Sequence, residues 1–284
     1  DMWQKIDKNA ELNRSVFIHC QNFVRGWLAH ADPTTGLIPR NINNQNNFWN
    51  ARDAAADNYP FMVLTSFFVD KDMYNGRMLD MLNTERSLTS RVGVLPDDFL
   101  FETQAFRTKE IEMKSIIFGA SEYAKDGLMP LTEWLGPTPW RDRMVGLVDG
   151  VIENAHIQTP VGVLPAVDHE VGGEMMQILS RMYWMTGDEK YKDFALRYAD
   201  YFLLHALPTE NDRLSLDDHG CEVIGGLSEV YLIASLKDEA RYKKYKAPMH
   251  KMLDRVLEIG RNANGLFYMA VNPITGEILR DELT

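Results

Sequence analysis

Apolar residues spaced three and four positions apart recur along most of the chain, and this period is typical of helices. The pattern predicts helices over residues 11–31, 72–89, 108–125, 139–155, 170–186, 188–207, 222–236 and 239–261. A Gly-apolar-apolar-Pro sequence interrupts it four times, and such a sequence suits the end of one helix and the approach to the next. The four interruptions lie at 36–40, 93–97, 127–131 and 162–166. Only the tail after residue 261 has the pattern of short strands, so we expect an all-α protein with little β structure.

The segment from Phe48 to Asp70 has a polar beginning and an apolar continuation. Pro60 fits the first turn of a helix but not its interior. We therefore expect the helix to begin near Asp57 or Asn58, and its apolar continuation predicts burial on most sides. Asp53 lies four residues before Asp57, so the two carboxylates would share one face of a helical turn.

The start of this segment also carries groups that suit a carbohydrate pocket. Trp49 and Arg52 stand beside the two aspartates, directly after an amide-rich stretch at 41–47. Carboxylates and amides bind sugar hydroxyls, and an indole can stack on a sugar face. The alternative is structural, with Asp57 as a helix cap and Asp53 as a solvated turn residue.

Three predicted helices share the same kind of beginning, with Asp or Asp-His followed by small residues and an apolar run. These beginnings lie at 51–60, 166–177 and 215–229. Each of the three helices is followed by a charged turn and a more amphipathic helix. The sequence thus predicts a repeated helical hairpin of about 50 residues, with the apolar helix of each pair inside.

These helix beginnings, the amphipathic partners and the Gly-x-Leu-Pro loops resemble the (α/α) toroid of the six-hairpin glycosidase superfamily. The resemblance covers nearly the whole chain and implies one toroid-like domain over 1–284. A complete ring of this kind would need about 300 residues or more. We therefore expect an incomplete toroid, or part of a longer protein. The superfamily includes glycoside hydrolases, sugar epimerases and polysaccharide lyases, so the resemblance implies a carbohydrate substrate without naming one.

In such a fold the helix beginnings would line the cavity. Glycoside hydrolysis needs two carboxyl groups facing each other across the scissile bond. Two carboxylates from one helical turn are usually too close together, whereas carboxylates from different hairpins can face each other. The predicted catalytic pair joins Asp53 or Asp57 with one of Asp168, Glu170 or Asp218.

Two histidines occupy matching places in the later repeats. His169 and His219 could bind sugar hydroxyls, transfer protons or act as the base of a lyase. Alternatively, each is a structural residue bonded to a neighbouring carboxylate. Glu222 at the third helix beginning is a further candidate for substrate binding, as are Trp134 and Trp140, which flank a loop before a helix.

Paired glycines, Gly172–Gly173 and Gly225–Gly226, stand inside two of the predicted helices. Glycine costs about 1 kcal/mol in a helix interior, so we expect these pairs to mark close packing between helices. Neither pair belongs to a phosphate-binding loop, and the His and Asp clusters lack a recognised metal-ligand spacing. We expect no catalytic metal and no cofactor.

Charge narrows the range of partners. The net charge is −11 and the isoelectric point is about 5.1, which argues against a nucleic-acid partner or an anionic membrane surface. No stretch reaches the roughly 18 apolar residues of a membrane span. The first residues lack the apolar core of a signal peptide, but the chain opens on Asp1 rather than Met, so a periplasmic or secreted location stays open.

Three functions follow from these observations. The leading hypothesis is a glycoside hydrolase acting on a polysaccharide or oligosaccharide, with a uronide-containing substrate as one option. A second is a polysaccharide lyase using His169 or His219 with a tyrosine, and Arg52 to neutralise a uronate carboxylate. A third is a helical repeat domain that binds a glycan or a partner without catalysis.

Overall fold

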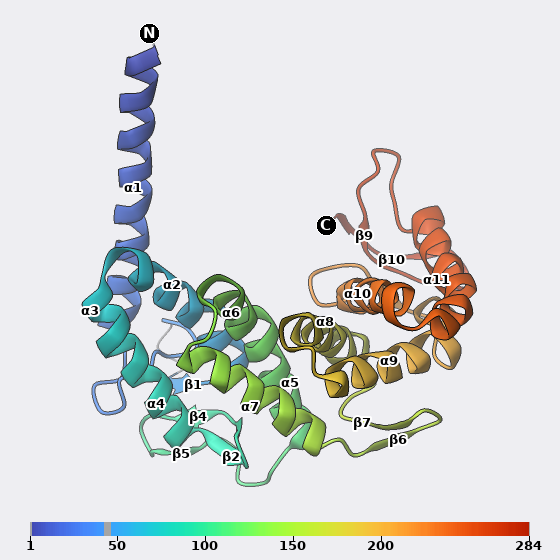
Figure 1. Cartoon of the computed structure of the whole chain (residues 1–284), viewed down its shortest axis with the longest axis horizontal. Helices are drawn as coiled ribbons and strands as arrows, with labels where there is room; N and C mark the ends of the chain where they lie inside the picture. Colours follow the sequence, from blue (N-terminus) through green and yellow to red (C-terminus); the bar gives the residue numbers. More distant parts are fainter. Residues whose placement is uncertain (1, 43–46, 284) are drawn as a thin grey trace. The chain divides into compact units, whose positions relative to one another are not determined.

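A computed structural model describes residues 2–42 and 47–283, and Figure 1 shows its course. Helices make up most of these residues, and the strands are short. The predicted all-α class of helical hairpins is therefore confirmed. The chain divides into two compact units, Asp1–Val151 and Ile152–Thr284, and each unit is described by itself.

Within residues 2–42 and 47–151, the first unit consists of helices with four two-residue strands and one three-residue strand. Its elements are α1 (Met2–Ala29), β1 (Phe48–Trp49), η1 (Ala51–Asn58), α2 (Tyr59–Val69), α3 (Lys71–Met73), η2 (Tyr74–Met78), α4 (Leu79–Leu88), β2 (Ser90–Val92), β3 (Leu95–Pro96), β4 (Phe99–Leu100), β5 (Ala105–Phe106), α5 (Met113–Glu122), η3 (Tyr123–Leu128), α6 (Met129–Leu135) and α7 (Pro139–Glu153), the last residues of which pass into the second unit.

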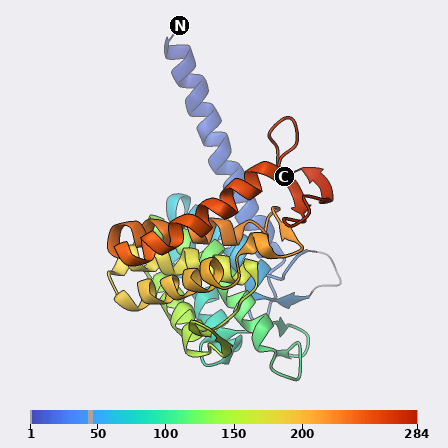
Figure 2. The ribbon, with the colours of Figure 1, turned by 90° about the vertical axis from the view of Figure 1, so that its right-hand side faces the viewer.

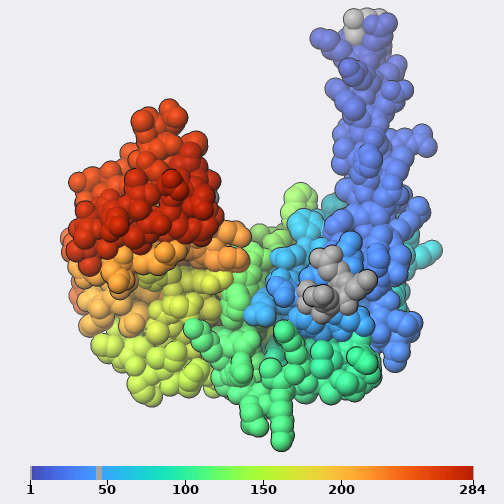
Figure 3. All heavy atoms as spheres, turned by 180° about the vertical axis from the view of Figure 1, so that it is seen from behind, coloured from blue at the N-terminus to red at the C-terminus, as the bar shows by residue number. Residues whose placement is uncertain are grey.

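Helix α1 begins earlier than the sequence pattern predicts, at Met2 rather than near residue 11. Residues 2–19 are exposed, and only the carboxyl-terminal part of the helix is packed on α2. The space-filling view shows the amino-terminal half standing clear of the other elements of its unit (Figure 3). Few apolar residues stand between residues 2 and 10, so the periodicity of apolar residues predicted this helix only from residue 11.

The segment from Phe48 to Asp70 forms two helices in succession after β1. The α-helix α2 begins at Tyr59, close to the predicted start, with Pro60 in its first turn. The π-helix η1 precedes it without a break, and its cap is Asn50, whose side chain accepts a hydrogen bond from the Ala54 amide at 3.0 Å. Asp57 thus lies inside a helix rather than at its cap, and the structural alternative considered for it was wrong.

One predicted helix break was also wrong. Residues 127–131 carry the same Gly-apolar-apolar-Pro sequence as the true breaks, yet the chain passes from α5 through η3 into α6 without leaving helical conformation. Pro130 stands where the π-helix η3 passes into the α-helix α6. By contrast, Gly36, Gly93 and Gly162 have positive φ angles and lie outside helices.

Buried polar groups tie the first unit together. The Tyr59 hydroxyl donates to the Met78 carbonyl at 2.6 Å and accepts from Trp140 Nε1 at 2.8 Å. Glu85 and Arg143 form a buried ion pair. Arg143 Nη1 also donates to the Val94 carbonyl at 2.6 Å, so the guanidinium joins α7 to both α4 and the β2–β3 hairpin.

The second unit consists of two consecutive helical hairpins and a small sheet. Its elements are β6 (Ile157–Thr159), β7 (Gly162–Leu164), α8 (His169–Thr186), α9 (Glu189–Leu204), η4 (Pro208–Glu210), β8 (Leu214–Ser215), α10 (Glu222–Lys237), α11 (Glu239–Ile259), β9 (Tyr268–Val271) and β10 (Ile278–Leu283). The hairpins α8–α9 and α10–α11 match the predicted repeats, and Figure 2 shows α11 along one side of α9 and α10.

The turns between paired helices are short because their caps are well formed. Gly187 ends α8 in the left-handed conformation, and Asp188 then caps α9 by accepting from the Lys190 amide. Asp238 ends α10 and caps α11 in the same way, through the Arg241 amide at 3.0 Å. Such short connections make the helices of each pair antiparallel neighbours.

The paired glycines lie where α8 and α10 cross, as the sequence predicts. A Cβ placed on Gly173 would collide with the backbone of Glu222 and Val223, and one on Gly226 would lie 2.5 Å from the Gly173 carbonyl oxygen. Gly172 faces the ring of Phe202 instead. Close approach of the two backbones therefore brings the amino-terminal ends of α8 and α10 together.

A three-stranded antiparallel sheet in the order β10-β9-β8 covers the carboxyl-terminal side of this unit. Buried Leu214, Leu216, Val256 and Val271 form the apolar cluster that joins the sheet to α11. Within residues 2–42 and 47–283, none of the helices combines the length and the apolar character that a membrane crossing requires.

Candidate functional site

The second unit holds an open cavity of about 490 Å³ at the amino-terminal ends of α8 and α10. Most of the lining residues are polar or charged. The lining consists of Val167, Asp168, His169, Glu170, Arg213, Ser215, Asp217, His219 and Gly220. The structure therefore brings the second and third predicted helix beginnings to one site.

Local structure explains how these side chains reach the cavity. Asp168 caps α8 by accepting from the Val171 amide at 3.0 Å, and this places His169 and Glu170 in the first turn. On the other side, β8 leads into a tight turn over 217–220, in which the Gly220 amide donates to the Asp217 carbonyl at 3.1 Å. A Cβ on Gly220 would collide with Ser215, so glycine allows this turn to close.

Glu170 and His219 form the central contact of the cavity. His219 Nδ1 lies 3.0 Å from Glu170 Oε1, and His219 Nε2 lies 3.5 Å from an Asp218 oxygen. Burial raises the pKa of the Glu170 carboxyl, and His219 opposes this shift, whereas the charges of Asp168, Glu222 and Asp218 add to it. Glu170 thus retains its proton to higher pH than an ordinary glutamate.

Asp217 forms an ion pair with an arginine from the tail of the chain. Arg280 of β10 approaches it, with Nη1 3.2 Å from an Asp217 oxygen. Sequence reasoning placed Asp217 at the third helix beginning but missed Arg280, because nothing local in the tail indicates that β10 lies beside this turn.

His169 lies against an apolar neighbour. Its ring centroid is 6.0 Å from that of Phe202, and its Nε2 is 3.4 Å from the side-chain nitrogen of Asn211. Burial lowers the pKa of His169, and the charge of Asp168 only partly offsets this. The imidazole is therefore mainly neutral at pH 7, the form that can accept a proton.

A hydrogen bond between Gln177 and Glu222 connects α8 with the first residue of α10. Gln177 of α8 donates through Nε2 to the carboxylate of Glu222, the first residue of α10. Sequence analysis predicted Glu222 as substrate-binding, and the structure places it beside the cavity rather than in its lining. Gln177 was not predicted.

The predicted catalytic aspartates of this unit differ from each other in their surroundings. Asp168 has a structural partner, since its carboxylate caps α8. Asp218 has a side chain that is 90% exposed, so solvent screens its charge. Glu170, the third predicted carboxyl of this unit, is partly buried, and this burial raises its pKa.

Asp53 and Asp57 belong to the first unit. Asp53 Oδ2 accepts from Arg40 Nε at 2.9 Å and from the Asn50 side chain, and Arg52 Nε lies 3.6 Å away. Asp57 is exposed on the π-helix η1. The pairing of either aspartate with a carboxylate of the second unit stays a prediction.

The predicted tryptophans have very different exposures. Trp49 is 3% exposed and Trp140 is 1% exposed, with its indole N–H bonded to Tyr59. Both rings are buried in the core of the first unit, and their role as stacking platforms stays a prediction. Trp134 is 69% exposed and meets the edge of Phe68. The apolar neighbours of Trp49 and Trp140 are distant in sequence, which is why their burial was not foreseen.

Within the second unit, Glu170 and His219 are two side chains of metal-binding type in mutual contact. Their contact is a hydrogen bond between a carboxyl group and an imidazole.

Comparison with known proteins gives little further guidance. No protein-family profile matches the sequence, and no curated protein matches it. Among solved structures, this chain is similar to a GH76 α-mannanase from Bacteroides thetaiotaomicron, with 14% sequence identity and a TM-score of 0.43. The similarity covers 78% of this chain and 65% of that one. At this TM-score the likeness carries no argument about fold or function.

Proposed function

We propose that the chain is a glycoside hydrolase and that the cavity at the start of α8 and α10 binds its carbohydrate substrate. The observation that carries this proposal is the pair of carboxyl groups, Glu170 and Asp217, that line this one cavity. Burial raises the pKa of Glu170, which suits a general acid, and Arg280 forms an ion pair with Asp217. Glycoside hydrolysis requires two carboxyl groups at the scissile bond, one of which acts as the acid.

In this proposal Glu170 is the general acid that protonates the oxygen of the leaving sugar. Asp217, which forms an ion pair with Arg280, is the base for water or the nucleophile. Ser215 and Arg213 also line the cavity and offer a hydroxyl and a guanidinium to sugar hydroxyls. Asp53 and Asp57 remain the alternative partners for Glu170, as the sequence predicts.

The test is a screen of the purified chain on a panel of polysaccharides and oligosaccharides, with reducing ends and ultraviolet absorbance measured together. New reducing ends without absorbance indicate hydrolysis. Glu170→Gln and Asp217→Asn should then each lower kcat/KM by about 10²- to 10⁴-fold. Asp212→Asn is the matched control, since this exposed carboxylate lies in the same loop region but not in the lining.

Unchanged turnover in Glu170→Gln would contradict the assigned role of Glu170. Binding of a glycan with no turnover on any substrate would instead support the non-catalytic glycan-binding domain.

A polysaccharide lyase is the second candidate, and one observation favours it. His169, with its lowered pKa, and Arg213 line the same cavity. A neutral imidazole could abstract the proton next to a uronate carboxyl, and the guanidinium could neutralise that carboxylate. Reducing ends accompanied by ultraviolet absorbance would favour this reaction, and His169→Gln and Arg213→Gln would then be the variants to measure.

A further inference from the structure

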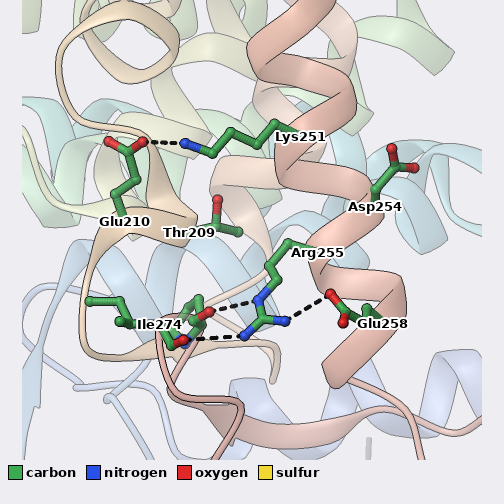
Figure 4. A pocket seen from close by; sticks show the side chains of 8 residues that line it. Thr209, Glu210, Lys251, Asp254, Arg255, Glu258 and Ile274 are labelled. Atoms are coloured by element: carbon green, nitrogen blue, oxygen red, sulfur yellow. Dashed lines mark hydrogen bonds and ion pairs between the residues drawn. The ribbon is translucent and has the colours of Figure 1, made fainter.

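Both cations that line a second cavity of the second unit are paired within the chain. The cavity has a volume of about 610 Å³ and lies between η4, α11 and the turn that joins β9 to β10 (Figure 4). Lys251 Nζ lies 2.5 Å from a Glu210 oxygen. Arg255 donates to Glu258 at 2.7 Å and to the carbonyl of Pro273 at 2.7 Å. The exposed half of α1, in the first unit, is a surface of another kind, because large apolar side chains face the solvent there.

The exposed half of α1 carries a stripe with the spacing of helices that pair along their length. Positions 2, 6, 9, 13, 16 and 20 follow one another at alternating intervals of four and three residues, which is a heptad pattern. These positions hold Met2, Ile6, Asn9, Asn13, Val16 and Cys20. Met2 is 66% exposed, Ile6 is 46% exposed and Val16 is 57% exposed. An apolar stripe of this kind marks a surface that another helix can cover.

The same face of α1 is already a packing surface further along the helix. Val24 stands four residues after Cys20, and it is buried where α1 packs on α2. Trp27, three residues after Val24, is partly buried. Helices in proteins gain most of their stability from the packing of such a face. Residues 2–19 extend this face beyond α2, and Figure 3 shows them standing clear of the other elements of the first unit.

The two asparagines of the stripe indicate that the covering helix is a second α1. An asparagine at a core position of a helix pair fixes the register of the pair. If a second α1 lies antiparallel on the first with Ile6 facing Val16, Asn9 of each copy faces Asn13 of the other. The two side-chain amides can then donate to and accept from each other. A wholly apolar partner would leave both amides without hydrogen bonds, which is costly.

The charges at the border of the stripe fit the same antiparallel arrangement. Asp7 and Arg14 border the stripe on one side and stand seven residues apart, close to two helical turns. In an antiparallel pair related by a two-fold axis, the same border of both helices meets. Asp7 of each copy therefore comes within reach of Arg14 of the other, and opposite charges pair twice.

From the heptad stripe, its continuity with the α1–α2 contact and the self-complementary positions of its polar residues, we propose that the chain forms a homodimer. The exposed half of α1 lies antiparallel against the same half of α1 in a second copy. Trp3 and Phe17, which are 67% and 51% exposed, widen the stripe beside Ile6 and Val16 and pack at its edge. Such a contact is isologous, since the same surface serves both copies.

The test is sedimentation velocity of the full chain, which should change from monomer to dimer as its concentration rises to about 100 μM. Ile6→Asp should raise the dimer Kd by about 100-fold or more, because the dimer would bury an unpaired carboxylate. Ile18→Asp is the matched control and should leave the Kd unchanged. Ile18 and Ile6 are both 46% exposed, but Ile18 lies on another side of the helix.

A charge exchange tests the antiparallel arrangement. Asp7→Arg should raise the Kd by about 5-fold at low salt, because the new cation would face Arg14 of the second copy. Combining Asp7→Arg with Arg14→Asp in one chain should restore the Kd.

A chain that stays monomeric at every concentration would overturn the proposal. A dimer whose Kd is unchanged by Ile6→Asp, or raised equally by Ile18→Asp, would overturn it as well. Failure of the double charge exchange to restore the Kd would contradict the antiparallel pairing. No carbohydrate enters this experiment, so its outcome is independent of the glycosidase assay.

Discussion

At the scale of single residues, the raised pKa of Glu170 determines how hydrolysis should depend on pH. A general acid works only while it is protonated, so kcat/KM should fall on the alkaline side as the pH rises through the Glu170 pKa. Glu170→Gln should lose this alkaline limb as well as activity. His219→Gln should move the limb to higher pH, because His219 opposes the raised pKa. The measurement is a pH profile of each variant on one substrate.

If the alkaline limb lies at the same pH in the unaltered chain and in His219→Gln, His219 does not lower the pKa of Glu170, and this prediction fails. Lys192→Gln is a suitable control for the loss of a charge elsewhere on the unit. Its ammonium pairs with Glu189 rather than with any group in the cavity.

The buried pair of Glu85 and Arg143 gives a prediction about stability. Arg143→Met should lower the free energy of unfolding by about 3–5 kcal/mol at pH 8, because it leaves a buried carboxylate without its cation. Burial already raises the pKa of Glu85 in the folded chain. A carboxyl group whose pKa is raised by folding contributes to the free energy of unfolding at pH values below its unfolded-state pKa. This contribution is lost as the pH rises through its folded-state pKa.

The cost of Arg143→Met should therefore be smaller at pH 5 than at pH 8, as measured by urea unfolding at both values. Arg86→Met changes an arginine one residue from Glu85 and is the control, with an expected effect below about 1 kcal/mol. If Arg143→Met lowers the free energy of unfolding equally at pH 5 and pH 8, the unpaired Glu85 carboxylate is not the cause of the loss.

At the scale of helices, the crossing of α8 and α10 depends on glycines that differ sharply in their surroundings. Gly226→Ala should destabilise the protein by about 3 kcal/mol or more, since its Cβ would lie 2.5 Å from the Gly173 carbonyl oxygen. Gly225→Ala is the matched control. Its Cβ would meet only the Gln177 side chain at 3.5 Å, and alanine is the better helix former by about 1 kcal/mol.

Thermal and urea unfolding of the two variants would measure the difference. Comparable stability of both variants would show that the helices do not approach as closely as Gly173 and Gly226 require. Because the crossing also brings Asp168 and Glu170 close to the turn over 217–220, Gly226→Ala should reduce activity more than Gly225→Ala does.

At the scale of the whole molecule, the division into two compact units is itself testable. A chain of residues 152–284 contains two complete hairpins, the sheet β10-β9-β8 and its own apolar cluster. A unit of this size is large enough to bury a core. We expect it to fold alone, with a helical circular-dichroism spectrum and a single cooperative urea transition. A gradual, non-cooperative loss of signal would contradict this.

Sequence periodicity was sufficient for much of this protein. The hairpins α8–α9 and α10–α11 and the glycine crossing followed from the spacing of apolar residues, from caps such as Asp188, and from the paired glycines, which are all local signals. The same local reasoning failed at Gly127 to Pro130, where a break sequence is helical. Glycine and proline permit a turn without requiring one, and packing of the surrounding helix decided the outcome.

For the candidate site, the sequence by itself determined which residue types stand at each helix beginning, because a cap and a first turn are set within a few residues. Tertiary structure alone decided which of them meet. Arg280 reaches Asp217 across a sheet, Glu170 becomes buried beside His219, and the rings of Trp49 and Trp140 enter the core. Each of these outcomes depends on contacts between residues far apart in the chain, and neither periodicity nor composition records such contacts.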